Sequence, residues 1–146
     1  METAQADLAT RYRTALEALG RQDLSSMADA YAPNVITADH AQQRTMHGVE
    51  EVIAWCREWL EAFPDSRITD LTCDGAGRWT IARFTATGIN HGPMGPLPAT
   101  GNPMTAELCS VARWEQGRIV EEHIYYDQHT VLAQLGHLPG VAAEAT

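Results

Sequence analysis

The chain has 146 residues, of which 45% are hydrophobic and 20% charged, and its formal net charge is −9. This size predicts one globular domain over residues 1–146, with a substantial core and no second domain. The 10 basic residues are scattered and cannot neutralise a nucleic-acid backbone, so a nucleic-acid-binding protein is excluded. The acidic balance also disfavours a purely anionic substrate.

The sequence contains no indication of export or of a membrane anchor. Met1 is followed by Glu2 and Asp7 instead of a basic segment and an apolar run. No uninterrupted apolar stretch reaches the length of about 18 residues that a membrane-spanning helix needs. The 3 cysteines are widely spaced and include no CxxC pair, which fits reduced thiols better than disulfides or zinc ligands. We therefore expect a cytoplasmic protein without a membrane segment.

The N-terminal part of the chain has helical periodicity. Apolar residues recur at helical spacing over Thr3–Gly20, which predicts a helix that ends at the glycine. Asp23 can cap a second helix that runs to about Tyr31. The run Val35–Ala38 is typical of a short edge strand, and residues 39–46 are polar and predict a loop.

A third helix is predicted over residues 49–63, because their apolar side chains form one wide face and a proline follows. Beyond Ser66 the period changes from helical to alternating, which predicts strands. Four candidate strands are Arg67–Cys73, Trp79–Ile89, Met104–Trp114 and Ile119–Tyr126. Thr130–Leu135 is expected to form a last short helix that ends at Gly136, and residues 140–146 a flexible tail.

Turn-forming residues separate these strands. Asp74–Gly77 and Glu115–Gly117 are typical hairpin connections. Residues 90–103 contain too many glycines and prolines for regular structure, so we expect a loop that covers the mouth of a pocket. Helices followed by an antiparallel sheet predict an α+β fold with the helices on one face of the sheet. A strongly curved sheet would be closed by these helices into a cone that leaves a hollow.

Several short segments together carry a resemblance to a known family. They are Gly48–Asp65, Thr87–Gly92, Thr100–Gly101, Gly117–Glu121, and Asp127 with Gln134–Gly136. Each segment alone is weak, but their combination over about residues 6–139 resembles the SnoaL-like polyketide cyclases of the NTF2-like superfamily.

The resemblance implies a cone-shaped α+β barrel, in which N-terminal helices pack on a strongly curved antiparallel or mixed sheet and a short helix ends the chain. It implies one deep pocket for a hydrophobic polycyclic ligand and a homodimer that forms through the outer face of the sheet. Members of the polyketide branch close the last ring of an anthracycline-type ester by an intramolecular aldol reaction, without metal or cofactor. Related proteins act as hydroxylases, hydrolyse epoxides or only bind ligands.

The resemblance assigns the family's acid/base to Asp127, and it puts Ser110 where the cyclases carry an assisting histidine. This departure makes a hydroxylase of the same pathway type an alternative to ring closure. From the residues alone, Asp127 has two interpretations that the sequence leaves open. The carboxyl can be buried among apolar walls, with its pKa raised toward the working pH, or it can cap the terminal helix.

Further candidates surround this carboxylate in the sequence. Strand alternation puts His123 and Tyr125 on the same face as Asp127, so His123 is a second catalytic candidate and Tyr125 a candidate for substrate binding. The rival interpretation puts this face outside, because Ile124 and Tyr126 belong to a competing apolar set. Ser110 is a candidate for substrate binding or for plain packing.

Four more residues are candidates for substrate binding. His91 and Met94 begin the glycine- and proline-rich loop, His40 follows a short strand, and Trp59 lies on the apolar face of the third helix. Each also has a structural interpretation, as a solvated histidine or a core side chain. No histidine pair has the spacing of a metal motif, and no nucleotide-binding loop occurs, so we expect neither a metal nor another cofactor.

Overall fold

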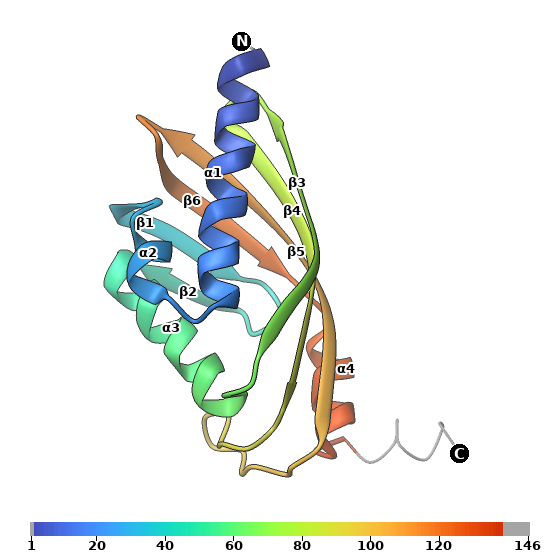
Figure 1. Ribbon diagram of the computed structural model, residues 1–146. Helices are drawn as coiled ribbons and strands as arrows, with labels where there is room; N and C mark the ends of the chain where they lie inside the picture. Colours follow the sequence, from blue (N-terminus) through green and yellow to red (C-terminus); the bar gives the residue numbers. More distant parts are fainter. Residues whose placement is uncertain (1, 139–146) are drawn as a thin grey trace.

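The computed structural model describes the backbone of residues 2–138 and the side chains of residues 7–138 (Figure 1). Its elements are α1 (Glu2–Gly20), α2 (Leu24–Ala28), β1 (Tyr31–Asp39), β2 (Arg44–His47), α3 (Val49–Ala62), β3 (Arg67–Ala76), β4 (Trp79–Ile89), β5 (Pro103–Glu115), β6 (Arg118–Tyr125) and α4 (Gln128–Leu135). The expected α+β class is confirmed. The predicted tail, residues 140–146, lies outside the described residues.

The strands form one mixed sheet in the order β2-β1-β6-β5-β4-β3. Only the pair β1 and β6 is parallel among the described strands, and the other neighbours are antiparallel. The sheet is strongly twisted and open, and α1, α2 and α3 lie on one side of it (Figure 1). Long-range contacts of α1 with β3 and of α3 with β1 and β2 hold the helices over this concave face.

The C-terminal strands agree with the sequence pattern. Trp79–Ile89 has the predicted bounds, and the other three strands differ from the prediction by one to three residues at an end. The hairpin between β5 and β6 turns at Gln116 and Gly117, both with positive φ (52° and 78°), as a tight two-residue turn requires. Gly136 ends α4 in the left-handed region with φ 93°.

The prediction for residues 23–46 was wrong in three respects. Helix α2 begins after the Asp23 cap but ends at Ala28, and Tyr31 already belongs to β1. Strand β1 is not an edge strand, because β2 covers its outer side. Within the polar segment 39–46, residues 40–43 form a turn and Arg44 begins β2. Strand β1 is longer than predicted because it continues through Pro33, and alternate residues from Val35 onward are buried.

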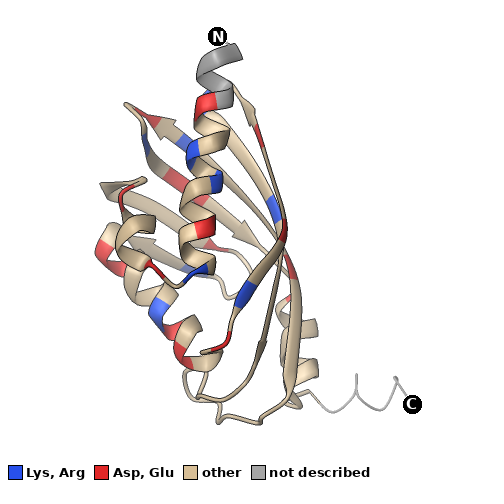
Figure 2. Ribbon diagram, viewed as in Figure 1, with Lys and Arg blue, Asp and Glu red and all other residues tan. Residues whose placement is uncertain are grey.

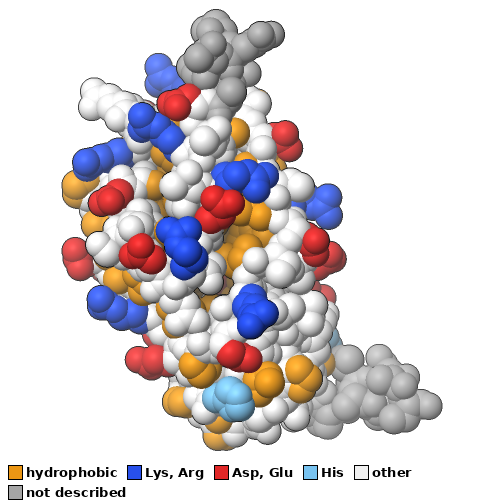
Figure 3. All heavy atoms as spheres, viewed as in Figure 1, with side chains coloured by type: hydrophobic (Ala, Val, Ile, Leu, Met, Phe, Trp, Pro, Cys, Tyr) orange, Lys and Arg blue, Asp and Glu red, His pale blue; other side chains and the backbone are white. Residues whose placement is uncertain are grey.

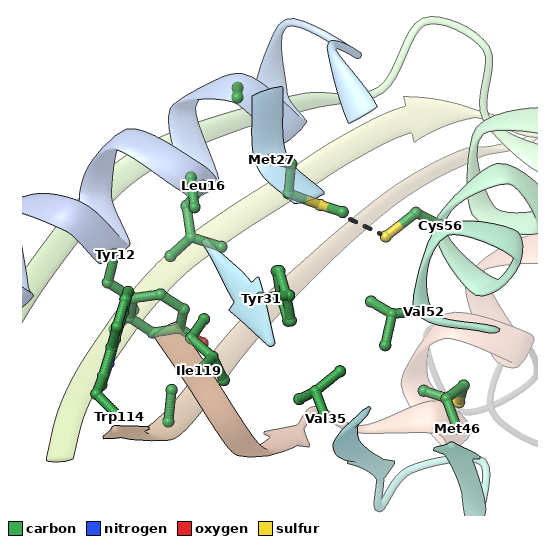
Figure 4. Packing of buried hydrophobic residues seen from close by; sticks show 14 of the residues in the cluster. Tyr12, Leu16, Met27, Tyr31, Val35, Met46, Val52, Cys56, Trp114 and Ile119 are labelled. Carbon is green, nitrogen blue, oxygen red and sulfur yellow. Dashed lines mark hydrogen bonds between the residues drawn. The ribbon is translucent and has the colours of Figure 1, made fainter. Parts of the chain in front are cut away.

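The core lies between α1, α3 and the concave face of the sheet (Figure 4). Tyr12 contacts Trp114 edge to face at 6.0 Å between ring centroids, and the Trp114 indole donates a 2.9 Å hydrogen bond to Thr80. A second, smaller cluster joins the end of α3, β5 and α4 and includes Phe63 and Met104. No helix within residues 2–138 has the length and hydropathy of a membrane span.

Candidate active site

A cavity lies between the helices and the concave face of the sheet, next to the main core cluster. Its volume is about 70 Å³, which is room for a few water molecules at roughly 10–15 Å³ each. Most of its walls are aliphatic or aromatic, with Trp55 and Trp59 from α3, Phe84 from β4 and Leu108 from β5. Polar side chains in the wall are Tyr31, Ser66, Ser110, Glu122 and Tyr126.

Glu122 is the acidic residue of this wall. It lies on β6 opposite Ala112 of β5, and only 2% of its surface is exposed. Tyr12 donates a 2.6 Å hydrogen bond to Oε2. Tyr31 lies 2.8 Å from Oε1 and 2.9 Å from Oε2, and the Thr37 hydroxyl lies 3.3 Å from Oε1. Three hydroxyl groups from α1 and β1 therefore hold one buried carboxyl at the cavity.

Burial raises the pKa of the Glu122 carboxyl above its ordinary value, and the hydrogen bonds from Tyr12, Tyr31 and Thr37 lower it by a smaller amount. No arginine forms an ion pair with Glu122 within the part of the chain that is described. Burial also raises the pKa of Tyr12 and Tyr31 well above the ordinary value, so both phenols remain protonated. A carboxyl with a raised pKa is suited to take up and release a proton near neutral pH.

Ser110 is connected to this carboxyl through Tyr12. The Ser110 hydroxyl lies 2.7 Å from the Tyr12 oxygen. Because a phenol has one proton, Tyr12 accepts from Ser110 when it donates to Glu122. Ser110, Tyr12 and Glu122 thus form a chain of hydrogen bonds whose two ends lie in the cavity wall.

A second buried carboxylate, Asp39, orients two aromatic residues of the wall. Asp39 is fully buried, with 0% of its surface exposed. Its carboxylate accepts hydrogen bonds from Trp55 Nε1 at 3.1 Å and from the Tyr126 hydroxyl at 3.2 Å. Gln42 and two backbone N–H groups complete its partners. Asp39 is fully satisfied by these bonds and fixes the aromatic side chains between itself and the cavity.

The expectation that Asp127 is buried at the cavity is wrong. Asp127 is exposed and caps α4, with Oδ1 accepting from Thr130 N at 3.1 Å and Oδ2 from the Thr130 hydroxyl at 2.6 Å. These hydrogen bonds lower the pKa of Asp127. Of the two interpretations of Asp127, the structure agrees with the helix cap.

The expected face of β6 is also wrong for His123 and Tyr125. Both lie on the outer face of the sheet, because strand alternation points Glu122 and Ile124 into the cavity. There His123 Nε2 lies 2.7 Å from Glu121 Oε2, and His123 Nδ1 lies 2.8 Å from His40 Nε2. His40 also stacks on Tyr125, with 4.6 Å between ring centroids. The structure brings these predicted residues together, but outside the cavity.

The loop that follows β4 does not cover the cavity. Its residues His91 and Met94 are not part of the cavity wall: His91 is exposed, and Met94 packs on the second cluster. The buried side chain of Asn90 ties the loop down by donating to Ala62 O at 3.3 Å and Gly92 O at 2.9 Å, and by accepting from Thr100 N at 2.8 Å. Trp59 and Ser110 are the predicted binding residues that do line the cavity.

The sequence patterns did not single out Glu122, Tyr12 or Tyr31 as functional residues. A signal for Glu122 was present, since the residues two and four positions later are Ile124 and Tyr126 and share its face. Among residues 7–138, no three His, Cys, Asp or Glu side chains form a group that could hold a metal ion.

Comparisons with known proteins agree with this architecture. The family model of the SnoaL-like polyketide cyclases matches residues 7–135, and no curated protein matches the chain. AclR from Streptomyces galilaeus, a putative hydroxylase, is similar in structure with a TM-score of 0.80 and 21% identity, over 92% of this chain and 99% of that one.

Two structures of putative polyketide cyclases are also similar. The one from Xanthomonas campestris has a TM-score of 0.82 and 18% identity, over 90% of this chain and 98% of that one. IdmH from Streptomyces antibioticus has a TM-score of 0.75 and 23% identity, over 88% of this chain and 98% of that one. The expected NTF2-like fold, a cone-like curved sheet packed against helices, is thereby confirmed.

Proposed function

Because the chain belongs to the SnoaL-like polyketide cyclase family, we propose that it is an enzyme that moves protons within the apolar cavity, with Glu122 as its acid/base. The observation that carries this proposal is the burial of one carboxyl, held by three hydroxyl groups, in the cavity wall. Glu122 takes the role that the family resemblance assigned to Asp127.

The proposed reaction is an intramolecular aldol ring closure. Ionised Glu122 removes the proton from the carbon next to an ester carbonyl, and this carbon then attacks a ketone of the same molecule. The proton held by Glu122 is returned to the alkoxide that the new carbon–carbon bond creates. Protons and electrons balance without a metal or cofactor, and one carboxyl serves both steps.

The proposed substrate is an aromatic polyketide ester of the anthracycline type. The tryptophan, phenylalanine and leucine side chains of the cavity suit a flat apolar ring system. A cavity of about 70 Å³ holds only part of such a molecule, so binding of a polycyclic ester requires the cavity to widen or the ligand to extend through its mouth.

Hydroxylation of a similar aromatic polyketide is the second candidate. It is favoured by Ser110, which stands where the cyclases carry a histidine, and by the structural likeness to AclR. The two reactions differ in their needs, because hydroxylation consumes molecular oxygen and a reductant whereas aldol closure consumes neither. Product formation under nitrogen therefore separates them. Ligand binding with no product at all would indicate a binding domain.

The proposal includes a homodimer in the cytoplasm. The outer face of the sheet exposes several large apolar side chains, among them Ile36, Trp79, Ile81 and Tyr125, and such a face is typical of a protein interface. The three cysteines are free thiols, which fits a reducing compartment.

The test compares two carboxylates of the same chain. Glu122→Gln is expected to abolish turnover of the methyl ester of a tricyclic anthraquinone polyketide, measured by mass spectrometry of the cyclised product. Asp127→Asn, the matched control, is expected to leave turnover within about twofold. Full activity of the Glu122 variant, or loss of activity only in the Asp127 variant, would refute the assignment.

A further inference from the structure

A groove on the helical side of the molecule gathers arginines beside the cavity. It lies between α1 and β3 and is lined by Arg13, Arg21 and Arg67, together with Glu17 and Asp70. Figure 2 shows basic positions on α1 and at the start of β3, and Figure 3 shows basic side chains around a hollow with an apolar floor on this face. The groove therefore holds 3 of the 10 basic residues of a chain with net charge −9.

The groove and the cavity are neighbours. Ile68 lines both of them. Leu19 lines the cavity, and the next residue of α1, Gly20, lines the groove. A ligand whose rings occupy the cavity can therefore extend a substituent past Ile68 to the arginines.

The cavity itself cannot neutralise an acidic group. None of its described lining residues is an arginine, lysine or histidine, and its acidic residue, Glu122, would repel an anion. A buried carboxylate without a partner is strongly destabilised, so an acidic substituent has to lie outside the apolar part of the site. The arginines of the groove are the cations that line the adjoining hollow.

These arginines are available to a ligand. Arg13 donates a 3.1 Å hydrogen bond from one guanidinium nitrogen to the backbone oxygen of Leu71. This oxygen belongs to a bulge in β3, where the register with β4 shifts and Asp70 has φ 55°. Within residues 7–138, neither Arg21 nor Arg67 forms an ion pair or a side-chain hydrogen bond, although Glu17 and Asp70 line the same groove.

We infer that the groove of Arg13, Arg21 and Arg67 binds a carboxylate or phosphate group on the ligand whose apolar part fills the cavity. The planar guanidinium fork matches both oxyanions. The inference rests on the proposed function, because it names the acidic end of the molecule that the cavity takes. Such a ligand is amphipathic and not purely anionic, because only its acidic end contacts the groove. The inference is therefore compatible with the net charge of −9 of the protein.

The test measures binding alone, by calorimetry at low salt with the full chain. The probes share one ring system and differ in charge: 2-naphthoic acid, 2-naphthyl phosphate and methyl 2-naphthoate. The native protein is expected to bind at least one of the two anions about fivefold or more tightly than the neutral ester. The tighter of the two anions identifies the group that the groove takes.

Two variants separate the groove from the general charge of the protein. Arg21→Gln with Arg67→Gln is expected to weaken binding of the preferred anion about fivefold to tenfold and to leave the ester unchanged. Arg78→Gln is the matched control, because Arg78 is exposed in the turn between β3 and β4 and does not line the groove. It is expected to change neither affinity by more than about twofold.

Four results would overturn the inference: no detectable binding of either anion, equal affinity for anions and ester, an unchanged anion affinity in the double variant, or an equal loss in the Arg78 control. The proposed function fails separately, through retained turnover of the Glu122→Gln variant. That variant is expected to keep the preference for the anion or to increase it, since Glu122 does not line the groove and its replacement removes an acidic group from the neighbouring cavity.

Discussion

Replacing Glu122 with Gln is expected to change how the stability of the protein depends on pH. Burial raises the pKa of Glu122 in the folded protein, whereas in the unfolded chain the pKa is about 4.3. Between these two values the unfolded chain has lost the proton and the folded protein keeps it. The free energy of unfolding of the native protein therefore falls as pH rises from the unfolded pKa through the folded pKa.

The size of the effect follows from linkage. Each pH unit inside that window lowers the stability contribution of Glu122 by about 1.4 kcal/mol. The Gln variant has no carboxyl to ionise, so its stability relative to the native protein rises with pH at this slope. Below about pH 4.3 the native carboxyl is protonated in both states, and the two proteins are expected to differ by a constant amount.

Urea unfolding at several pH values from about 3 to 8, followed by tryptophan fluorescence, measures this difference. Glu121→Gln is the control with the opposite sign, because His123 and then Arg113 lower the pKa of Glu121. Glu121 stabilises the protein above its unfolded pKa, and this stabilisation is lost as pH falls through its folded pKa. A stability difference between the Glu122 variant and the native protein that stays flat or falls with pH would refute the argument from burial.

Three further predictions concern the site, the loop and the outer face. Tyr31→Phe removes a hydrogen bond that lowers the pKa of Glu122, so the ascending limb of kcat/KM against pH is expected to move to higher pH; an unmoved limb would argue against it. Gly92→Ala places a Cβ 1.9 Å from the backbone oxygen of Glu61 and is expected to cost about 1–3 kcal/mol or more in urea unfolding, and native stability of this variant would contradict the close approach. Ile81→Glu puts a charge on the apolar outer face, where Ile81 is 44% exposed, and light scattering is expected to show a monomer; a dimer mass like that of the native protein would exclude this face as the interface.

Much of the fold could be predicted from the sequence, because local patterns determine it. The alternation of Trp79–Ile89 and the proline after α3 mark their elements without reference to the rest of the chain. The part that failed, residues 23–46, depends on pairing with β6 far along the chain. The short polar segment β2 forms a strand because its backbone pairs with that of β1.

The candidate site was harder to predict because its chemistry depends on which face of β6 is inside. A shift by one residue exchanges Glu122 for His123, and each face contains aromatic and charged side chains. A buried glutamate is rare without partners, and its partners, Tyr12 and Tyr31, are 110 and 91 positions away in the chain. Only the tertiary structure brings the three hydroxyl groups to this carboxyl.

The proposed chemistry requires Glu122 to be a carboxyl with a raised pKa in the cavity wall. Carbon-13 NMR of protein labelled at glutamate side chains tests it directly, with the Glu122 signal assigned by its loss in Glu122→Gln. We expect a titration midpoint clearly above the ordinary value of about 4.3. A midpoint at or below that value would contradict it.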